Sequence, residues 1–387
     1  MILGIDASNI RAGGGLTHLS EMLAFSAPQE AGFKKVVVWG SENTLSKLPN
    51  KDWLDLVHVS QLDRGLLSRI YWQRVTFPVL ADKNCDVLFV PGGSYSRSAT
   101  PVVTMSQNLL PFEAKEFIRY GFSWVFIRLL LLRFVQARSF KKADGVIYLT
   151  KYAHKAVTEL IGDIRGKHAI IPHGINKDFF SPPKLQLDIE QYSFDQPFKL
   201  YYVSIVDMYK HQWRVVAAVA QLRNESLPVE LHLIGPSYPP ALKKLEQSLN
   251  QFDPAGEFVH YHGAVAYADL PSHTAKADGA IFASTCENLP IILLEAMASG
   301  VPIACSDFGP MPEVLRDAGV YFDPENENSI YQALRLLLRD DKLREKSANL
   351  AYGYAMNYSW EKCARETLAF LFAVAQDNQS ALNANFR

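Results

Sequence analysis

The chain has 387 residues, of which 48% are hydrophobic and 20% charged, and its formal net charge is −1 at pH 7. These values are ordinary for a globular protein large enough for two domains, and the near-zero charge argues against a dedicated nucleic-acid-binding protein. The four cysteines follow neither metal-binding spacing nor a paired framework, which is typical of a reducing compartment. The first residues show no pattern of a secretion signal, so we expect a cytoplasmic protein.

The first half alternates short apolar runs with helical patterns. The runs are short enough to be strands buried on both faces, and turn residues bound most of them. They lie at residues 1–5, 36–39, 87–90, 102–105 and 146–149. This alternation predicts an α/β domain with a parallel sheet, which we place at residues 1–180.

A glycine-rich loop, Gly13-Gly14-Gly15, separates the first run from the helical pattern that follows. Glycines at this position allow the backbone to approach a phosphate or a sugar closely, although a flexible turn is the alternative. The loop is not a dinucleotide-binding fingerprint, because His18 stands where a third glycine belongs.

Polar residues follow the run at 102–105. Open α/β sheets bind ligands at the carboxyl ends of their strands, where this chain has Gln107 and Asn108. Neither side chain can act as a base at neutral pH, but both can orient a hydroxyl group. A plain turn is the alternative.

The segment 117–155 is rich in aromatic and basic residues, with eight Lys or Arg residues and a single acid, Asp144. Arg119, Arg128 and Arg133 argue against a transmembrane helix. Positive charge among apolar side chains favours contact with an anionic membrane surface. A core helix with solvated ends and a dimer contact are the alternatives.

The second half repeats the strand pattern. Apolar runs lie at residues 199–203, 231–234, 259–261 and 280–283. A proline-marked linker precedes them, and His173 stands just before it. A plain polar turn is the alternative to a functional role for His173. We therefore place a second domain at residues 190–359, and a C-terminal helix at 360–387 that joins the first domain.

Lys210 stands at a junction between a strand and a helix. A lysine there can meet a diphosphate as a point charge beside the free N–H groups of the helix. A solvated lysine is the alternative.

Two carboxylates flank the start of an apolar helix between Pro290 and Gly300, a proline suited to a first turn and a glycine suited to a helix end. Glu287 precedes this helix and Glu295 lies within it, on a segment apolar on nearly every face. A buried carboxylate costs several kcal/mol unless it is paired or hydrogen-bonded. Glu295 is therefore either a structural residue held by protein groups or an acceptor for ligand hydroxyls, beside a helix N-terminus that faces an anion.

The stretch from Glu287 to Glu313 resembles the Glu-x7-Glu signature of retaining, nucleotide-sugar-dependent glycosyltransferases, family 4-like. That family has two Rossmann-like domains with a cleft between them, the GT-B architecture. The resemblance implies that Glu287 contacts the donor sugar, Glu295 the nucleotide ribose and Lys210 the diphosphate. We also assign six further residues to the donor side, Gly14, Gly15, Gly235, Asn288, Leu289 and Pro290, and three to the acceptor side, Gln107, Asn108 and His173.

The chain departs from the family pattern in three places. The family often has a histidine near Gln107 and Asn108, an asparagine where this chain has His173, and an arginine where it has Ile205. These departures leave the donor base, the donor sugar and the acceptor open.

The resemblance implies a hexosyltransferase that moves a sugar from a nucleoside diphosphate to a hydroxyl acceptor. With the basic segment, we expect a lipid-linked glycan as acceptor, in surface-polysaccharide assembly at the inner face of the membrane. The alternatives are an epimerase or phosphorylase of the same fold, or a non-catalytic sugar-nucleotide-binding protein. We expect neither cofactor nor metal, because the chain has no Asp-x-Asp motif and His260, His262 and His273 lack metal-ligand spacing.

Overall fold

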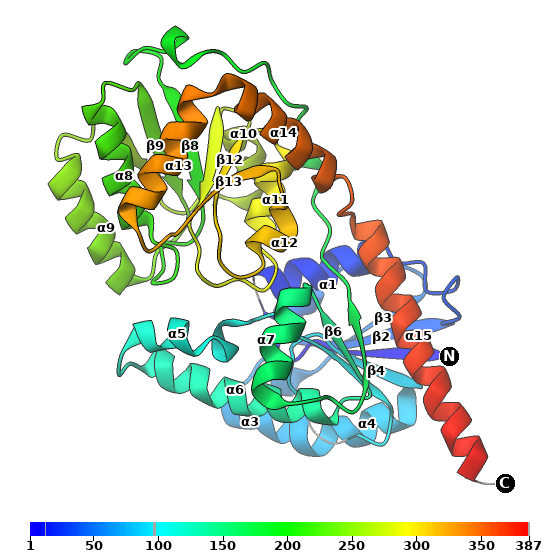
Figure 1. The fold of residues 1–387 in the computed structure, drawn as a ribbon. Helices are drawn as coiled ribbons and strands as arrows, with labels where there is room; N and C mark the ends of the chain where they lie inside the picture. The colour runs from blue at the N-terminus through cyan, green and yellow to red at the C-terminus, as the bar shows by residue number, and fades with distance from the viewer. Residues whose placement is uncertain (12, 96–97, 386–387) are drawn as a thin grey trace. The chain divides into compact units, whose positions relative to one another are not determined.

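The computed structural model describes residues 1–11, 13–95 and 98–385 (Figure 1). The chain forms two compact units: the first holds Met1–Phe112, Trp124–Gly174 and the chain from Ser359 onward, and the second holds Glu113–Ser123 and Ile175–Tyr358. Residues 113–123, which the sequence placed in the domain 1–180, thus lie with the second unit. The C-terminal helix lies in the first unit, and residues 386–387 of its expected range fall outside the described residues.

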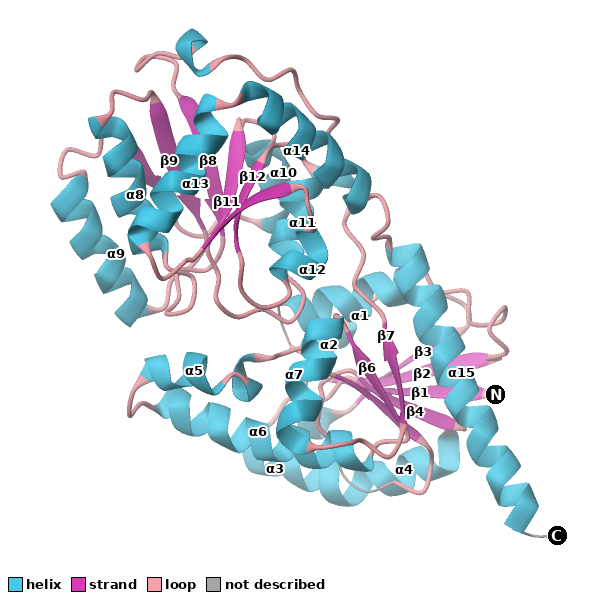
Figure 2. Cartoon of the chain, in the orientation of Figure 1, coloured by secondary structure: helices cyan, strands magenta, loops and turns pink. Residues whose placement is uncertain are grey.

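The first unit contains a parallel sheet of seven strands in the order β3-β2-β1-β4-β5-β6-β7, with helices on both faces (Figure 2). The central strands β4 and β5 are buried along their whole length because helices cover both sides. The strands are β1 (Ile2–Asp6), β2 (Lys35–Gly40), β3 (Leu54–His58), β4 (Val87–Val90), β5 (Val102–Met105), β6 (Gly145–Tyr148) and β7 (Lys167–Ile170). Its helices are α1 (Gly14–Ala24), α2 (Glu42–Leu45), α3 (Leu66–Tyr71), α4 (Phe77–Asn84), α6 (Trp124–Lys142), α7 (Lys151–Ile161) and α15 (Trp360–Asn385), with a π-helical turn η2 (Trp72–Thr76) and 3-10 turns η1 (Ser60–Leu62) and η3 (Leu110–Phe112).

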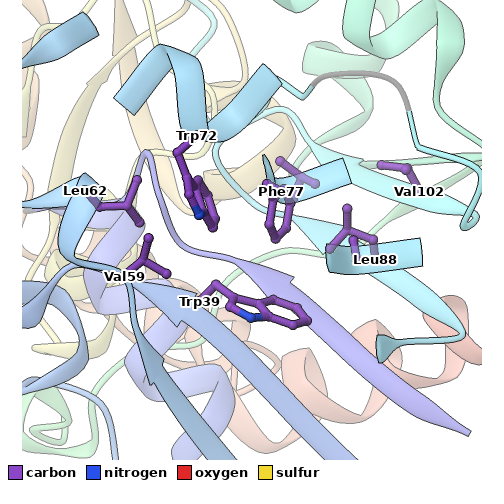
Figure 3. Close-up of a cluster of buried hydrophobic side chains, with 9 residues drawn as sticks. Trp39, Val59, Leu62, Trp72, Phe77, Leu88 and Val102 are labelled. Atoms are coloured by element: carbon purple, nitrogen blue, oxygen red, sulfur yellow. The ribbon is translucent and has the colours of Figure 1, made fainter. Parts of the chain in front are cut away.

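An aromatic cluster holds the segment from α3 to α4 on this sheet (Figure 3). Trp72 stacks on Phe77 with ring centroids 4.6 Å apart, and Trp39 of β2 meets Phe77 edge-on at 5.5 Å. Leu88 and Val102 of the sheet complete the contact. Burying each such side chain contributes about 1.5–3 kcal/mol. This burial holds one face of the segment against the sheet, and the other face is exposed to solvent.

The second unit contains a parallel sheet of six strands in the order β10-β9-β8-β11-β12-β13. The strands are β8 (Phe198–Val203), β9 (Val229–Ile234), β10 (Val259–Tyr261), β11 (Gly279–Phe282), β12 (Ile303–Ser306) and β13 (Gly319–Phe322). The helices are α5 (Ala114–Phe117), α8 (Gln212–Asn224), α9 (Pro239–Phe252), α10 (Leu270–Thr274), α11 (Ile291–Ala298), α12 (Met311–Leu315), α13 (Glu327–Arg339) and α14 (Asp341–Ala355), with 3-10 turns η4 (Ile118–Tyr120), η5 (Lys177–Phe179), η6 (Ile189–Gln191) and η7 (Tyr267–Asp269). Two doubly wound α/β sheets agree with the fold class expected from the sequence.

In the part of the chain that the structure describes, no helix combines the length and the apolar character needed to cross a membrane.

Candidate functional site

The loops after β8 and β11 carry two residues that the sequence predicts to bind the donor, Lys210 and Glu287. These strands are parallel neighbours, so both loops leave the same edge of the sheet. Lys210, at the end of the first loop, forms an ion pair through its Nζ with Oε1 of Glu287 in the second. Two sequence-predicted residues 77 positions apart are thus brought into contact.

The Lys210–Glu287 pair is largely withdrawn from water, with side chains only 4% and 16% exposed. The ammonium group lies 5.0 Å from the ring centroid of Phe282 and 5.1 Å from that of Tyr209. Desolvating two charges costs several kcal/mol, which their attraction repays only with good geometry. Paired charges held in an aromatic setting at the carboxyl edge of a sheet are typical of a ligand-binding site.

Glu295 is buried in the middle of α11. Burial raises the pKa of its carboxyl to about 7, and the hydrogen bond that Tyr267 donates to Oε1, 2.7 Å long, acts in the opposite direction. A protein group, the tyrosine hydroxyl, therefore satisfies part of the hydrogen-bonding capacity of Glu295. A carboxylate accepts about four hydrogen bonds, so Glu295 retains capacity for ligand hydroxyls.

The remaining donor-side residues of this unit shape the loops. Asn288 and Leu289 are buried, and Pro290 immediately precedes α11, where no side chain caps the helix. Gly235 has φ +147°, and a Cβ atom there would lie 2.1 Å from the carbonyl oxygen of Ser204. Only glycine therefore lets the loop after β9 pack against the loop that leads to Lys210.

Residues 113–123 form a contact with these loops that the sequence did not indicate. Glu116 accepts a hydrogen bond from Oγ1 of Thr285, 2.6 Å long, and Tyr120 donates one to Asp207, 2.9 Å long. Arg119 bonds to Glu116 and to Glu325, each at 2.7 Å. The charge of Arg119 is neutralised by these two acids. We therefore interpret Arg119 as a structural residue that anchors residues 113–123 to the rest of the second unit, and not as a substitute for the arginine that the family has in place of Ile205.

In the first unit, two of the three acceptor-side residues share one cluster. A Cβ atom on Gly15 would lie 2.9 Å from Oε1 of Gln107, whose Nε2 lies 3.3 Å from Nδ1 of His18. The ring of His18 stacks on that of His173 at 4.4 Å. Asn108 does not join this cluster: it is exposed and accepts a hydrogen bond from the next turn, at the N–H of Leu110.

The two clustered histidines are neutral at pH 7. Burial lowers the pKa of His18 to about 4, and burial together with the neighbouring His18 lowers the pKa of His173 well below its usual value. Nε2 of His18 has no hydrogen-bond partner among the described residues. Sequence reasoning missed His18 as a site residue, although its place three residues after Gly15 was a usable signal.

A second cluster of polar residues, which the sequence did not indicate, lies at the carboxyl ends of β1 and β4. Asp6 is buried, which raises the pKa of its carboxyl to about 6, although the backbone N–H of Ser8 donates a 2.9 Å hydrogen bond to it. Asp6 lines a cavity with Gln73, Ser94 and Val135. Gln73 also donates a 2.7 Å hydrogen bond to Ser8. The cavity thus joins hydrogen-bonding groups to an apolar wall.

Comparison with known proteins identifies a family for the part of the chain that carries Lys210, Glu287 and Glu295. The profile of the family described as "Glycosyl transferases group 1" matches residues 186–353, which include both loops and α11. Residues 186–353 belong to the group 1 glycosyl transferases. The matched residues include the stretch from Glu287 to Glu313, so the resemblance of that stretch to a glycosyltransferase family is confirmed.

Curated relatives match the chain over part of their length. The chain is 35% identical over 111 residues to the O-antigen chain mannosyltransferase B of Escherichia coli, covering 29% of each chain. It is 27% identical over 233 residues to a GDP-mannose-dependent α-(1-6)-phosphatidylinositol monomannoside mannosyltransferase of Mycolicibacterium smegmatis, covering 56% of this chain and 59% of that protein. The chain therefore spans less than two-thirds of the length of these relatives.

Solved structures match the chain over nearly its whole length. Sucrose-phosphate synthase from Thermosynechococcus elongatus has a TM-score of 0.70 at 17% identity, covering 100% of this chain and 99% of that one. The Anabaena protein HepE in complex with UDP has a TM-score of 0.66 at 16% identity and covers 99% of both chains. At these identities the likeness concerns the fold, and the GT-B fold expected from the sequence is confirmed.

Proposed function

We propose that the protein is a retaining glycosyltransferase that moves a sugar from a nucleoside diphosphate donor to a hydroxyl acceptor. The observation that carries the proposal is the buried Lys210–Glu287 ion pair at the carboxyl edge of the second sheet. The activities in the printed names of the E. coli and mycobacterial relatives, both mannosyltransferases, support it. So does the binding of UDP by the Anabaena structure, which shares the fold.

The ion pair suggests how the donor is held. In our proposal the diphosphate takes Lys210 as its counter-charge, which frees Glu287 to accept hydrogen bonds from the sugar hydroxyls. Glu295 accepts those of the ribose, and the N-terminus of α8 adds its dipole to the phosphate charge. Asn288, Leu289, Pro290 and Gly235 shape the donor loops. No metal ion is required to neutralise the leaving group.

The transfer step then needs no separate base. The bond between the anomeric carbon and the phosphate oxygen breaks as the bond to the acceptor oxygen forms on the same face of the sugar. The acceptor proton passes to the departing phosphate oxygen. Gly14, Gly15, Gln107 and His173 remain our candidates for orienting substrate in the first unit, with His18 and Asp6 added to them by their burial and position.

A panel of nucleotide sugars tests this function. We expect one donor, with GDP-mannose and UDP-glucose as the first candidates, to raise the thermal unfolding temperature, since a ligand at about 100 times its Kd adds about 2.7 kcal/mol. With labelled donor and a hydroxyl acceptor, the label is expected in a glycoside. Label found in an epimerised donor or in a sugar phosphate would instead identify the alternative reactions, and binding without any product would identify a non-catalytic protein.

We further propose that the acceptor is a lipid-linked glycan reached at an anionic membrane surface, as in surface-polysaccharide assembly at the cytoplasmic face. The sequence pointed to 117–155, and within it α6 carries the supporting surface. Five large apolar side chains of α6 are exposed at intervals that place them on one helix face: Trp124, Ile127, Leu131, Phe134 and Val135. Arg128, Arg138, Lys141 and Lys142 are exposed as well, and α6 contains no acid.

The neighbouring segment from α3 to α4 extends this surface. Leu67, Tyr71, Val75 and Val79 are exposed at four-residue intervals, on the side opposite the aromatic cluster. Val135 of α6 and Arg74 of η2 line the same cavity as Asp6, so the two helical segments are neighbours. Apolar side chains among cations suit an anionic lipid surface, and the polar cavity beside them suits a glycan headgroup.

Vesicle binding tests the membrane proposal. The pair of changes Trp124→Ser and Leu131→Ser is expected to weaken co-sedimentation with phosphatidylglycerol–phosphatidylcholine vesicles at least about tenfold, because each large side chain contributes about 1.5–3 kcal/mol when buried. Binding by the unaltered protein should fall with added salt. The matched control, Leu336→Ser with Met356→Ser, removes similarly exposed side chains from the second unit and should change nothing. Equal losses in both variants would contradict the proposal.

A further inference from the structure

The second sheet contains a histidine cluster that the proposed transfer does not use. Glu230 and His232 are two residues apart on β9, so they share one face of the sheet. His260 of β10 pairs in register with His232 and lies on the same face. The donor-site residues Lys210 and Glu287 lie instead in the loops that follow β8 and β11.

The ligand atoms of these three residues converge. Oε2 of Glu230 lies 3.4 Å from Nε2 of His232 and 3.8 Å from Nε2 of His260. One ligand atom from each residue lies within 4.8 Å of the others. Ligand atoms at about 2.0–2.2 Å from a tetrahedral zinc ion stand about 3.3–3.6 Å apart, so small side-chain rotations suffice to surround an ion.

Two further observations point to a bound ion. Nε2 of His232 is shielded from solvent and has no hydrogen-bond partner among the described residues, which leaves a buried polar atom aimed at Glu230. The other ring nitrogen, Nδ1, lies 3.0 Å from Nε2 of His262. A histidine that binds a metal commonly donates its second N–H to a carboxylate, a carbonyl or a water, and the acceptor nitrogen of a neutral imidazole can take the same place, which would fix the tautomer that offers Nε2.

We propose that Glu230, His232 and His260 bind a divalent transition-metal ion, with zinc as the best match to two imidazoles and one carboxylate. His262 is a positioning residue that acts through His232. Because β10 is a three-residue strand at the edge of the sheet, the ion would cross-link this edge strand to β9. The role is structural and independent of the proposed glycosyl transfer.

Zinc titration of the tag-free full chain tests this site. By calorimetry we expect one zinc ion per chain with a sub-micromolar Kd, and a zinc-dependent rise in unfolding temperature. His260→Ala and Glu230→Gln should each weaken binding at least about 100-fold, and His262→Ala about 10–100-fold. Cobalt in place of zinc should give the visible absorption of a tetrahedral site, absent from His260→Ala. Circular dichroism checks that each variant is folded.

His168→Ala is the matched control, because His154 and His168 form a stacked histidine pair in the first unit, with ring centroids 4.2 Å apart. This variant should bind zinc within about twofold of the unaltered chain. The proposal is overturned if the unaltered chain takes up no zinc, or if His260→Ala and Glu230→Gln both bind it as before. Loss of binding in His168→Ala would place the ion elsewhere and would also overturn it.

Discussion

Replacing Glu287 by glutamine is expected to lower kcat/KM for sugar transfer about 100- to 1,000-fold, or about 3–4 kcal/mol of transition-state stabilisation. The glutamine keeps the shape of the side chain but loses the charge that accepts the donor hydroxyls and faces Lys210. Binding of the free nucleoside diphosphate should change less than about tenfold, because that ligand lacks the sugar. Single-turnover transfer and nucleotide titration measure the two quantities separately.

Glu246→Gln, on the exposed surface of α9, is the control for this change and should transfer sugar at the original rate. Undiminished transfer by Glu287→Gln would remove the central residue of the proposed site. Equal loss of transfer and nucleotide binding, with a lowered unfolding temperature, would assign Glu287 to the stability of the loops.

Lys210→Met is expected to destabilise the protein by about 3–5 kcal/mol, since it leaves the carboxylate of Glu287 without its counter-charge in a largely buried setting. Glu287→Leu should cost a similar amount for the converse reason. The double change, Lys210→Met with Glu287→Leu, removes both charges and should recover most of the lost stability. It should still be inactive, because the diphosphate and the sugar have lost their partners. Urea unfolding and transfer assays together test this cycle.

The exposed pair Lys155 and Glu159 provides a matched cycle, with side chains 73% and 67% exposed and charged atoms 3.7 Å apart. Its coupling energy should stay below about 1 kcal/mol, because water screens both charges. A Lys210–Glu287 coupling no larger than this would show that the buried pair does not hold the two loops together.

Among the described strands, every interior strand except β12 could be predicted from the sequence, but of the four edge strands only β10 could. The runs at 87–90 and 102–105 became the fully buried strands β4 and β5. No apolar run predicted β3, β7, β12 or β13. Three of these, β3, β7 and β13, are edge strands of their sheets, and an edge strand buries less surface and so carries a weaker apolar signal. The fourth, β12, has the sequence Ile-Ala-Cys-Ser, which is short and only weakly apolar.

Part of the candidate site could likewise be predicted from the sequence, and part could not. Lys210 and Glu287 were identified because each follows a recognisable strand, and parallel strands bring their carboxyl ends together. The contact of Glu116 with Thr285 joins residues 169 positions apart, and Glu116 lies just before the segment 117–155, whose own sequence suggested a membrane surface. Periodicity reports which face of an element is buried, but not against which distant partner it packs.

The sequence by itself determined the α/β class, the family resemblance and two acids, Glu287 before α11 and Glu295 within it, because strand burial, turn residues and motif spacing are local properties of the chain. Only the tertiary structure decided that residues 113–123 pack on the second unit, that His18 and His173 stack as neutral rings, and that His232 meets His260 and Glu230. Such pairings depend on strand order and register, which are set by the burial of whole sheets and not by any short stretch of sequence.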